Sequence, residues 1–364
     1  MARKLVFDRI LFAAVLALVG LGLVMVYSST AAVTRNVGAM GNMLFIKQVV
    51  AAFIGLGAML CCMHVDYRRL KEPAFIYGAL GFMGALLVAV LFGPEINGSR
   101  RWFRMSGLSF QPSELAKLVV IVFVAYQIDR KRDRIDNHLF LIPVTFVTGL
   151  FAALILVGKD LGTTAMLCLP ICLMVFLAGV SLRFVAFGAM VVGPMVVMAI
   201  ATQEYRRRRL LAFLDPEADP LGMGFQLLQS LIAVGSGGVF GLGPGGSVQK
   251  LHFLPSPHAD FIFSIVAEEL GLIGSALFIG LFGIVLWRGV AAGRHAPESF
   301  GRFLCWGFTA LLFTQAMIHM SVALGVLPTT GVPLPFISHG GSSLIVSMMA
   351  AGLILNVSQH GEGG

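Results

Sequence analysis

The sequence predicts an all-α integral membrane protein with about ten transmembrane helices. Of the 364 residues, 57% are apolar and only 12% are charged, and the mean hydropathy is +0.89. Soluble domains have about a quarter of their residues charged, so this chain lacks the polar side chains that would cover a soluble globule. The apolar residues also fall into runs of about 20, the length of a helix that crosses a bilayer. The 43 glycines suit closely packed membrane helices.

The apolar runs place ten spans in one polytopic domain over residues 1–364. The expected spans are 10–28, 43–64, 73–92, 112–128, 138–157, 160–179, 184–203, 261–287, 303–326 and 340–357. The first run is too long for the apolar core of a cleaved signal peptide, so it is assigned as a retained span. Residues 204–260 form the longest loop, between the seventh and eighth spans, and its apolar stretches predict a segment lying at the membrane interface.

The distribution of positive charge predicts that both termini are cytoplasmic. Short loops on the side of the termini carry 14 Lys and Arg, and those on the opposite side carry 5. Positive residues concentrate on the cytoplasmic side, so the 204–260 loop is expected to be periplasmic. The same rule explains much of the net charge of +8, and nucleic acid is not an expected partner. The five cysteines lie in apolar runs and are expected to pack as small core residues without disulfides.

Ionisable residues inside predicted spans are costly and mark candidate sites. Lys47 lies near the outer end of the second span, and Glu114 and Lys117 share one face of the fourth because they are three residues apart. Asp160 lies at the start of the sixth span, where a carboxylate meets the positive end of the helix dipole. Two interpretations stay open for these residues. They line a polar cavity that opens outward, or they are structural, as an interhelical ion pair and a helix cap.

Two basic clusters are expected on the outer side. They comprise Arg100, Arg101 and Arg104 around Trp102, and the consecutive Arg206, Arg207, Arg208 and Arg209. Guanidinium groups bind phosphates through forked donors, so the clusters indicate a polyanionic, lipid-linked ligand; the alternative is a solvated charged face. The glycine-rich stretch 235–247 lacks the GK[ST] ending of a nucleotide-binding loop. It forms either an anion-binding nest of amides or a close-packed turn.

Asp260 gives the sharpest local signal, because it lies where the long loop meets an apolar helix. At the mouth of an outward cavity it would serve as a general base; the alternative is a helix N-cap. Burial raises a carboxyl pKa and nearby arginines lower it, so the net direction stays open. His258 is two residues away, and no paired Cys/His spacing predicts a metal site. The last outer loop, 327–343, contains three prolines and three glycines and predicts a rigid re-entrant turn shielded by protein.

Together these segments resemble the SEDS family of bacterial membrane proteins (shape, elongation, division and sporulation). The resemblance covers nearly the whole chain, in family order, at 97–102, 111–117, 160–164, 229–238, 249–250, 258–263 and 335–343. Residues 27–29 and 247–250 resemble the division branch more than the elongation branch. The chain departs from the family at Lys159, Ala259 and His339, which replace the usual Pro, Thr and Tyr. It also has Ser256-Pro257 where a Glu is usual.

The resemblance implies a glycosyltransferase that polymerises lipid II at the outer face of the bacterial cytoplasmic (inner) membrane, at the division septum. Asp260 would deprotonate the acceptor sugar, and undecaprenyl pyrophosphate would leave. The charge of that leaving group requires arginines or a divalent cation such as Mg²⁺. The implied substrate-binding residues are Arg100, Arg101, Arg206, Arg207, Arg208, Arg209, Lys250, His258, Ser342 and Ser343. The implied partners are a class B penicillin-binding protein transpeptidase and other division proteins.

Two other functions stay open. A lipid II flippase would depend on the charges within the spans, Lys47, Glu114 and Lys117. A scaffold for division proteins would have no catalytic residue. The three hypotheses differ in what they require of Asp260, since only the enzyme needs its carboxylate for chemistry.

Overall fold

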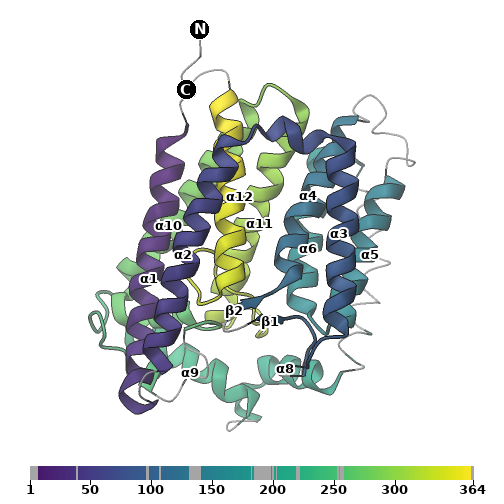
Figure 1. Ribbon diagram of the computed structural model, residues 1–364. Helices are drawn as coiled ribbons and strands as arrows, with labels where there is room; N and C mark the ends of the chain where they lie inside the picture. The colour runs from purple at the N-terminus through teal and green to yellow at the C-terminus, as the bar shows by residue number, and fades with distance from the viewer. Residues whose placement is uncertain are drawn as a thin grey trace.

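The computed structural model describes residues 7–37, 40–95, 98–105, 108–130, 141–181, 203–218, 222–251 and 258–361, together with the single residues 183, 198, 201 and 254. Long helices run side by side, and short elements lie across one end of the bundle (Figure 1). The start of the first helix and the end of the last lie together at the other end, where the Asp8 amide donates to Ser358 Oγ at 3.3 Å. We call this the terminal end, and the opposite end the site end. The shared position agrees with an even number of spans.

The long helices confirm a multi-pass membrane protein. They are α1 (Arg9–Val37), α2 (Met40–His64), α3 (Pro73–Leu91), α4 (Pro112–Arg130), α5 (Leu141–Val157), α6 (Leu161–Leu177), α10 (Ile262–Arg294), α11 (Ser299–Ala323) and α12 (Gly341–His360). Six of them, namely α1, α2, α3, α10, α11 and α12, are long and apolar enough to cross a membrane. Helices α5 and α6 are apolar but shorter, and α4 carries charged residues. The predicted 184–203 span lies largely outside the described residues.

The short elements lie mainly at the site end. They are β1 (Phe103–Met105), β2 (Leu108–Phe110), α8 (Glu204–Leu214), η4 (Pro216–Ala218), α9 (Met223–Ser236) and η5 (Gln249–Leu251), with η1 (Tyr67–Lys71) at the terminal end. Strands β1 and β2 form an antiparallel pair with Phe103 opposite Phe110, a small addition to the predicted all-α fold. Helices α8 and α9 lie across the ends of the long helices (Figure 1). The long loop therefore contains folded segments, as its apolar stretches predict.

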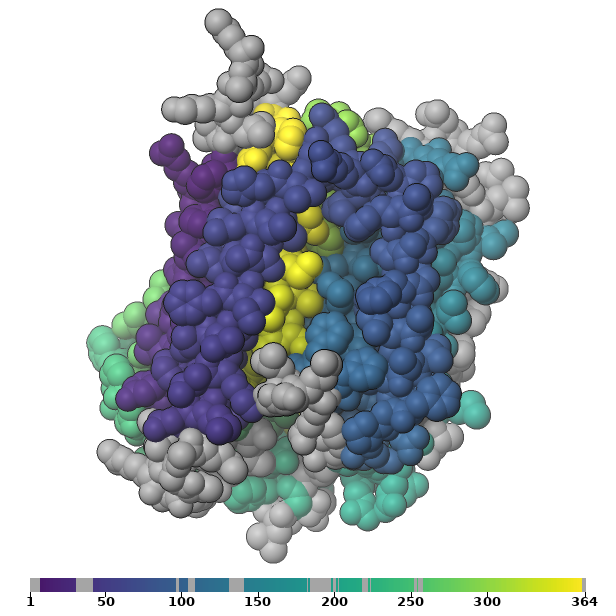
Figure 2. Space-filling model, in the orientation of Figure 1, coloured from purple at the N-terminus to yellow at the C-terminus, as the bar shows by residue number. Residues whose placement is uncertain are grey.

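Helix α12 is central, and α2 lies outside it. The most apolar window of α12 is 78% buried, and that of α2 is 22% buried. Figure 2 shows α12 between α2 and α3 on one face of the molecule. At the terminal end the Asn356 amide donates to the carbonyls of Cys62 (3.0 Å), Met63 (2.8 Å) and Val65 (2.8 Å). Carbonyls at a helix end lack intrahelical partners, so Asn356 supplies them and joins α2 to α12.

The close approach of α2 and α12 generates a stability prediction. A Cβ at Gly352 would lie 2.5 Å from the Met59 carbonyl oxygen, whereas a Cβ at Gly57 would meet no atom within 4 Å. Gly352→Ala is expected to destabilise the protein by about 1–3 kcal/mol through overpacking. The matched control Gly57→Ala is expected to be neutral or slightly stabilising. Thermal unfolding in detergent measures both, and equal midpoints for the two variants would contradict the packing described.

Candidate functional site

The loop between α11 and α12 is the centre of the site end. Its residues Leu334, Phe336, Ile337 and Ser338 are buried, which agrees with the predicted shielded turn. Two α11 side chains bind its backbone. Gln315 Nε2 donates to the Pro333 carbonyl at 2.9 Å, and His319 Nδ1 lies 2.8 Å from the Val332 carbonyl. Backbone polar groups within a membrane protein need such internal partners.

The Glu114–Lys117 pair continues this network into α4. Lys117 Nζ lies 2.9 Å from Glu114 Oε1, and the two side chains are 2% and 4% exposed. The ammonium also donates to Gln315 Oε1 at 3.2 Å. Bonds therefore run from α4 through α11 to the loop at Pro333. A buried ion pair persists only where further hydrogen bonds satisfy it, so the geometry favours the structural interpretation of this pair.

Asp260 lies beside the same loop. On its N-terminal side, the Ala259 carbonyl accepts from Ser338 Oγ at 2.8 Å and the His258 carbonyl accepts from the His339 amide at 2.9 Å. A Cβ placed on Gly331, which has a φ of +68°, would lie 3.9 Å from both Asp260 carboxylate oxygens. The loop backbone thus approaches the carboxylate closely and fixes the peptide that precedes it.

The charge on Asp260 is set by two opposing effects. Burial raises the pKa of this carboxyl, and the positive charges of Arg209 and Arg101 lower it; the net direction is upward. Desolvation disfavours the charged form, whereas a nearby cation favours it. This answers the question that the sequence leaves open. Asp260 is a more basic carboxylate than a solvated one and has cationic neighbours.

Arg101 joins Asp260 to the start of α6. Its guanidinium lies 3.1 Å from Asp160 Oδ2, and the Asp160 side chain is 4% exposed. Asp160 also accepts from the Thr163 amide (3.0 Å), Thr163 Oγ1 (2.8 Å) and Gln111 Nε2 (2.9 Å). Asp160 therefore caps α6, which agrees with the structural interpretation, and the same carboxylate holds Arg101 in place. Arg101 Nε is buried and has no hydrogen-bond partner within the described residues.

Helix α8 sorts the four consecutive arginines into two pairs. Arg207 and Arg208 are exposed, and Arg206 and Arg209 are partly buried, because residues three apart share a helix face. Arg209 donates to the Thr329 carbonyl at 3.0 Å. Burial lowers the pKa of Arg206, and the charge of Asp160 opposes that shift without reversing it. Of these four arginines, Arg207 and Arg208 lie on a solvated charged face, which was the alternative to an anion site.

His258 and His339 form a second polar group beside Asp260. Their rings lie 5.5 Å apart, edge to face. Burial lowers the pKa of His258. Burial, with the charges of His258 and Lys47, lowers that of His339 to about 4. Both rings are therefore neutral at pH 7. The charge of Lys47 acts on His339, and Ser343 Oγ is buried with no hydrogen-bond partner within the described residues.

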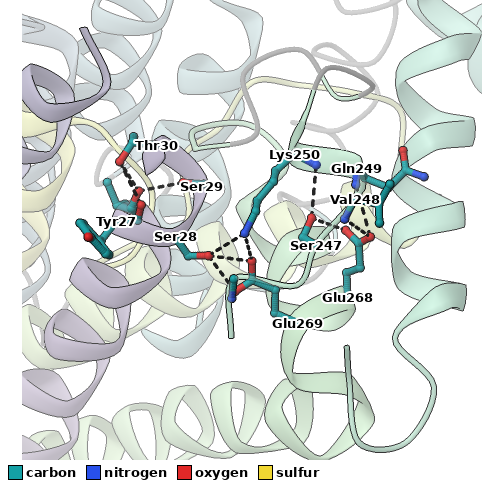
Figure 3. A network of polar contacts seen from close by, with 12 residues as sticks. Tyr27, Ser28, Ser29, Thr30, Ser247, Val248, Gln249, Lys250, Glu268 and Glu269 are labelled. Atoms are coloured by element: carbon teal, nitrogen blue, oxygen red, sulfur yellow. Dashed lines mark hydrogen bonds and ion pairs between the residues drawn. The ribbon is translucent and has the colours of Figure 1, made fainter. Parts of the chain in front are cut away.

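Three more of the predicted substrate-binding residues have protein partners. Arg100 donates to the Leu91 carbonyl at 3.3 Å and lies 3.8 Å from Glu95. Ser342 Oγ donates to the Ser109 carbonyl at 3.0 Å. Lys250 Nζ lies 2.6 Å from Glu269 Oε1, inside a buried network (Figure 3). A substrate contact by any of the three stays a prediction.

Sequence reasoning missed the residues that support the site from α11 and its loop. The Gln315 side-chain amide accepts from Lys117, and the Thr329 carbonyl accepts from Arg209. The backbone of Gly331 approaches the Asp260 carboxylate. Gln315 is a polar residue in an apolar helix, and that was the one available signal. Arg104 lies in β1, where its side chain is outside the described structure.

Removing one arginine tests the balance at Asp260. Arg209→Gln is expected to raise the pKa of Asp260 further, because the cation that opposes desolvation is lost. Infrared difference titration, with Asp260→Asn subtracted to isolate the Asp260 band, measures the shift. The exposed Arg207→Gln serves as the control and is expected to leave the band unchanged. An identical pKa of Asp260 in the wild type, Arg209→Gln and Arg207→Gln would contradict the described electrostatics.

Comparison with known proteins identifies the family. The sequence model described as "Cell cycle protein", for FtsW, RodA and SpoVE, matches residues 8–363. The chain is 39% identical over 360 residues to a protein of Geobacter sulfurreducens named "Probable peptidoglycan glycosyltransferase FtsW", covering 98% of this chain and 96% of the relative. It is 38% identical over 358 residues to "Stage V sporulation protein E" of Bacillus subtilis, covering 97% of each.

Comparison with solved structures agrees with this family. A chain from "Structural coordination of polymerization and crosslinking by a peptidoglycan synthase complex" superposes with a TM-score of 0.78 at 34% identity, with 97% of each chain covered. The rod shape determining protein RodA of Thermus thermophilus superposes with a TM-score of 0.73 at 28% identity, with 99% of each chain covered. This chain is a member of the FtsW/RodA/SpoVE family of multi-pass membrane proteins.

Proposed function

We propose that this chain is a peptidoglycan glycosyltransferase that polymerises lipid II, with Asp260 as the general base. The observation that carries the proposal is a carboxylate that lies against the α11–α12 loop, with a pKa that burial raises and that the charges of Arg101 and Arg209 partly lower. The relatives named as peptidoglycan glycosyltransferases and the polymerising complex among the similar structures support the same reaction.

The chemistry is a group transfer between two lipid-linked sugars. Asp260 takes the proton of the acceptor hydroxyl, and the oxygen attacks the anomeric carbon of the donor. The bond from that carbon to the pyrophosphate oxygen breaks, and undecaprenyl pyrophosphate leaves with the electron pair. A general base works best when its pKa approaches the working pH, so burial of Asp260 favours proton removal.

The leaving pyrophosphate needs positive charge. Arg101 pairs with Asp160, and the charges of Arg101 and Arg209 act on Asp260. We assign charge neutralisation to these two arginines and to Arg206, which shares the partly buried face of α8 with Arg209. A divalent cation such as Mg²⁺ is the other candidate. Within the described residues, no three His, Cys, Asp or Glu side chains gather as a metal site, and Asp160 is already occupied by Arg101 and three hydrogen bonds. The described donors therefore do not form a Mg²⁺ site, and in the proposed reaction the arginines supply the positive charge.

The proposed setting is the cytoplasmic membrane of a bacterium at the division septum, with the site end facing the periplasm. The excess of Lys and Arg in loops on the side of the termini supports this orientation. The proposed partner is a class B penicillin-binding protein, together with other division proteins. Similarity to a chain from a complex that couples polymerisation and crosslinking supports a transpeptidase partner.

The flippase and scaffold hypotheses receive less support. A flippase that uses charges within the spans would need them available to a moving headgroup. Glu114 and Lys117 are instead paired with each other and with Gln315 in a buried position. A scaffold would not need a desolvated carboxylate beside two arginines. Among the three hypotheses, glycosyltransferase activity is the one that requires a desolvated carboxylate with cationic groups near it.

Polymerisation by Asp260 variants tests the proposal. In liposomes containing lipid II and the partner, Asp260→Asn and Asp260→Ala are expected to lower the rate of glycan synthesis by about 10²–10⁴-fold, the usual contribution of a general base. Glu204→Gln, an exposed acidic residue at the same end, is expected to leave the rate unchanged. Co-purification with the partner checks folding. Wild-type rates from folded Asp260→Ala protein would refute the assignment.

The two faces of α8 give a matched comparison. Replacing Arg206 and Arg209 with Gln is expected to raise the KM for lipid II about 10–100-fold, because hydrogen bonds to charged groups contribute roughly 1.5–3 kcal/mol. Replacing Arg207 and Arg208 with Gln makes the same change of net charge on the exposed face and is expected to alter KM little. Equal KM values for the two double variants would contradict a role for Arg206 and Arg209 in binding lipid II.

A further inference from the structure

Helix α10 is broken near the site end. At Gly271 the backbone has φ 64° and ψ −161°, outside the helical region. Before the break every residue from Ile262 to Glu269 is buried, and directly after it Leu272 and Ile273 are 64% and 56% exposed. The helix thus has an outer half, residues 262–270, that is enclosed by protein, and an inner half, residues 272–294, of which only one face is buried.

A separate loop fills the break with its own backbone. In a continuous helix the amides of Leu272 and Ile273 would donate to the carbonyls four residues earlier, at Glu268 and Glu269. They donate instead to the carbonyls of Gly238 (2.9 Å) and Val239 (3.3 Å). The Glu268 and Glu269 carbonyls accept in turn from the amides of residues 242 and 243, both at 3.0 Å. We call residues 238–243 the inserted loop.

Glycine is required where the loop meets the helix. A Cβ at Gly241 would lie 2.2 Å from the Glu269 carbonyl oxygen, and one at Gly271 would lie 2.4 Å from the Gly241 amide nitrogen. Both residues also have positive φ, +80° and +64°, which side chains disfavour. The glycine-rich stretch of the sequence is therefore a close-packed joint with α10.

The side chains at the break hold the next segment of the same loop (Figure 3). Glu268 accepts from Ser247 Oγ (2.5 Å) and the Val248 amide (2.9 Å). Glu269 pairs with Lys250 at 2.6 Å, with the two side chains 1% and 5% exposed. Lys250 Nζ also donates to Ser28 Oγ of α1 at 3.0 Å. Each glutamate thus binds the inserted loop through its backbone carbonyl and binds the segment 247–250 through its carboxylate.

We propose that Lys250, Glu268 and Glu269 are positioning residues for Asp260, acting with the inserted loop. Asp260 precedes the first residue of the outer half of α10 by two positions, and that half is fixed to α1 and to the loop by these bonds. A shift of the outer half would break the backbone bonds and the buried ion pair together. This inference rests on the proposed role of Asp260, and it gives Lys250 a role in holding the base and not in binding substrate.

A charge-removal cycle separates positioning from substrate binding. Lys250→Met and Glu269→Gln each leave one buried partner without its counter-charge, and each is expected to lower kcat for lipid II polymerisation about 100-fold, the scale of a misplaced catalytic group, without changing KM. The double variant Lys250→Met/Glu269→Gln removes both charges and is expected to recover kcat at least about tenfold relative to either single variant. A raised KM in Lys250→Met that the second change does not repair would overturn the proposal.

Hydrogen–deuterium exchange provides a readout that does not depend on turnover. Gly241→Ala is expected to expose the amides of residues 242, 243, 272 and 273 to exchange and to lower kcat. Gly280→Ala, in the same helix where a Cβ would meet no atom within 4 Å, is expected to change neither. Lost protection with an unchanged kcat would overturn the positioning role. Failure of Asp260 as the base would be seen separately, as wild-type polymerisation by Asp260→Ala with the exchange pattern intact.

Discussion

The site end depends on one constraint, which is that polar groups inside a membrane protein must find their partners within the protein. Two irregular segments lie there against buried helices, and neither has a strand ladder to satisfy its backbone. The α11–α12 loop takes its bonds from Gln315, His319 and Ser338. The inserted loop takes its bonds from the broken α10. Both segments are held by many specific bonds, and Asp260 lies two residues before the start of α10, against the α11–α12 loop.

Exclusion of water at the site end also sets the basicity of the Asp260 carboxylate. Burial disfavours the ionised carboxylate, and Arg101 and Arg209 prevent that effect from going further. A carboxylate without the arginines would stay protonated over more of the pH range, and one in open water would be a weaker base. The arginines therefore have two uses in the proposed reaction. They moderate the base, and they face the place where pyrophosphate charge develops. The buried Asp160 holds the partly exposed Arg101 by an ion pair, which extends the arrangement to α6.

Hydropathy predicted the long helices, and local chemistry offered the cap at Asp160 as one of two interpretations. Long apolar runs define spans regardless of how they pack, so their positions agree with α1, α2, α3 and α10 to α12. Asp160 was predictable as a cap because capping is local. The sorting of the four arginines required a helical register for α8, which a segment assigned only as loop does not supply. The resemblance implies a substrate contact for Lys250, and its partners Ser28 and Glu269 could not be predicted from the sequence because they come from distant elements. The break at Gly271 was missed because glycines are frequent in membrane helices, and only the approach of the inserted loop distinguishes this one.

Chemical rescue tests the central claim most directly. Asp260→Ala removes the carboxylate and leaves space for a small anion beside Arg101 and Arg209. If Asp260 removes the acceptor proton, formate is expected to restore lipid II polymerisation by this variant in proportion to its concentration, with no gain for Asp260→Asn, whose amide fills the space. Chloride at the same ionic strength is the control and is expected to have no effect. Polymerisation that formate leaves unchanged in Asp260→Ala protein, folded and bound to its partner, would contradict the account.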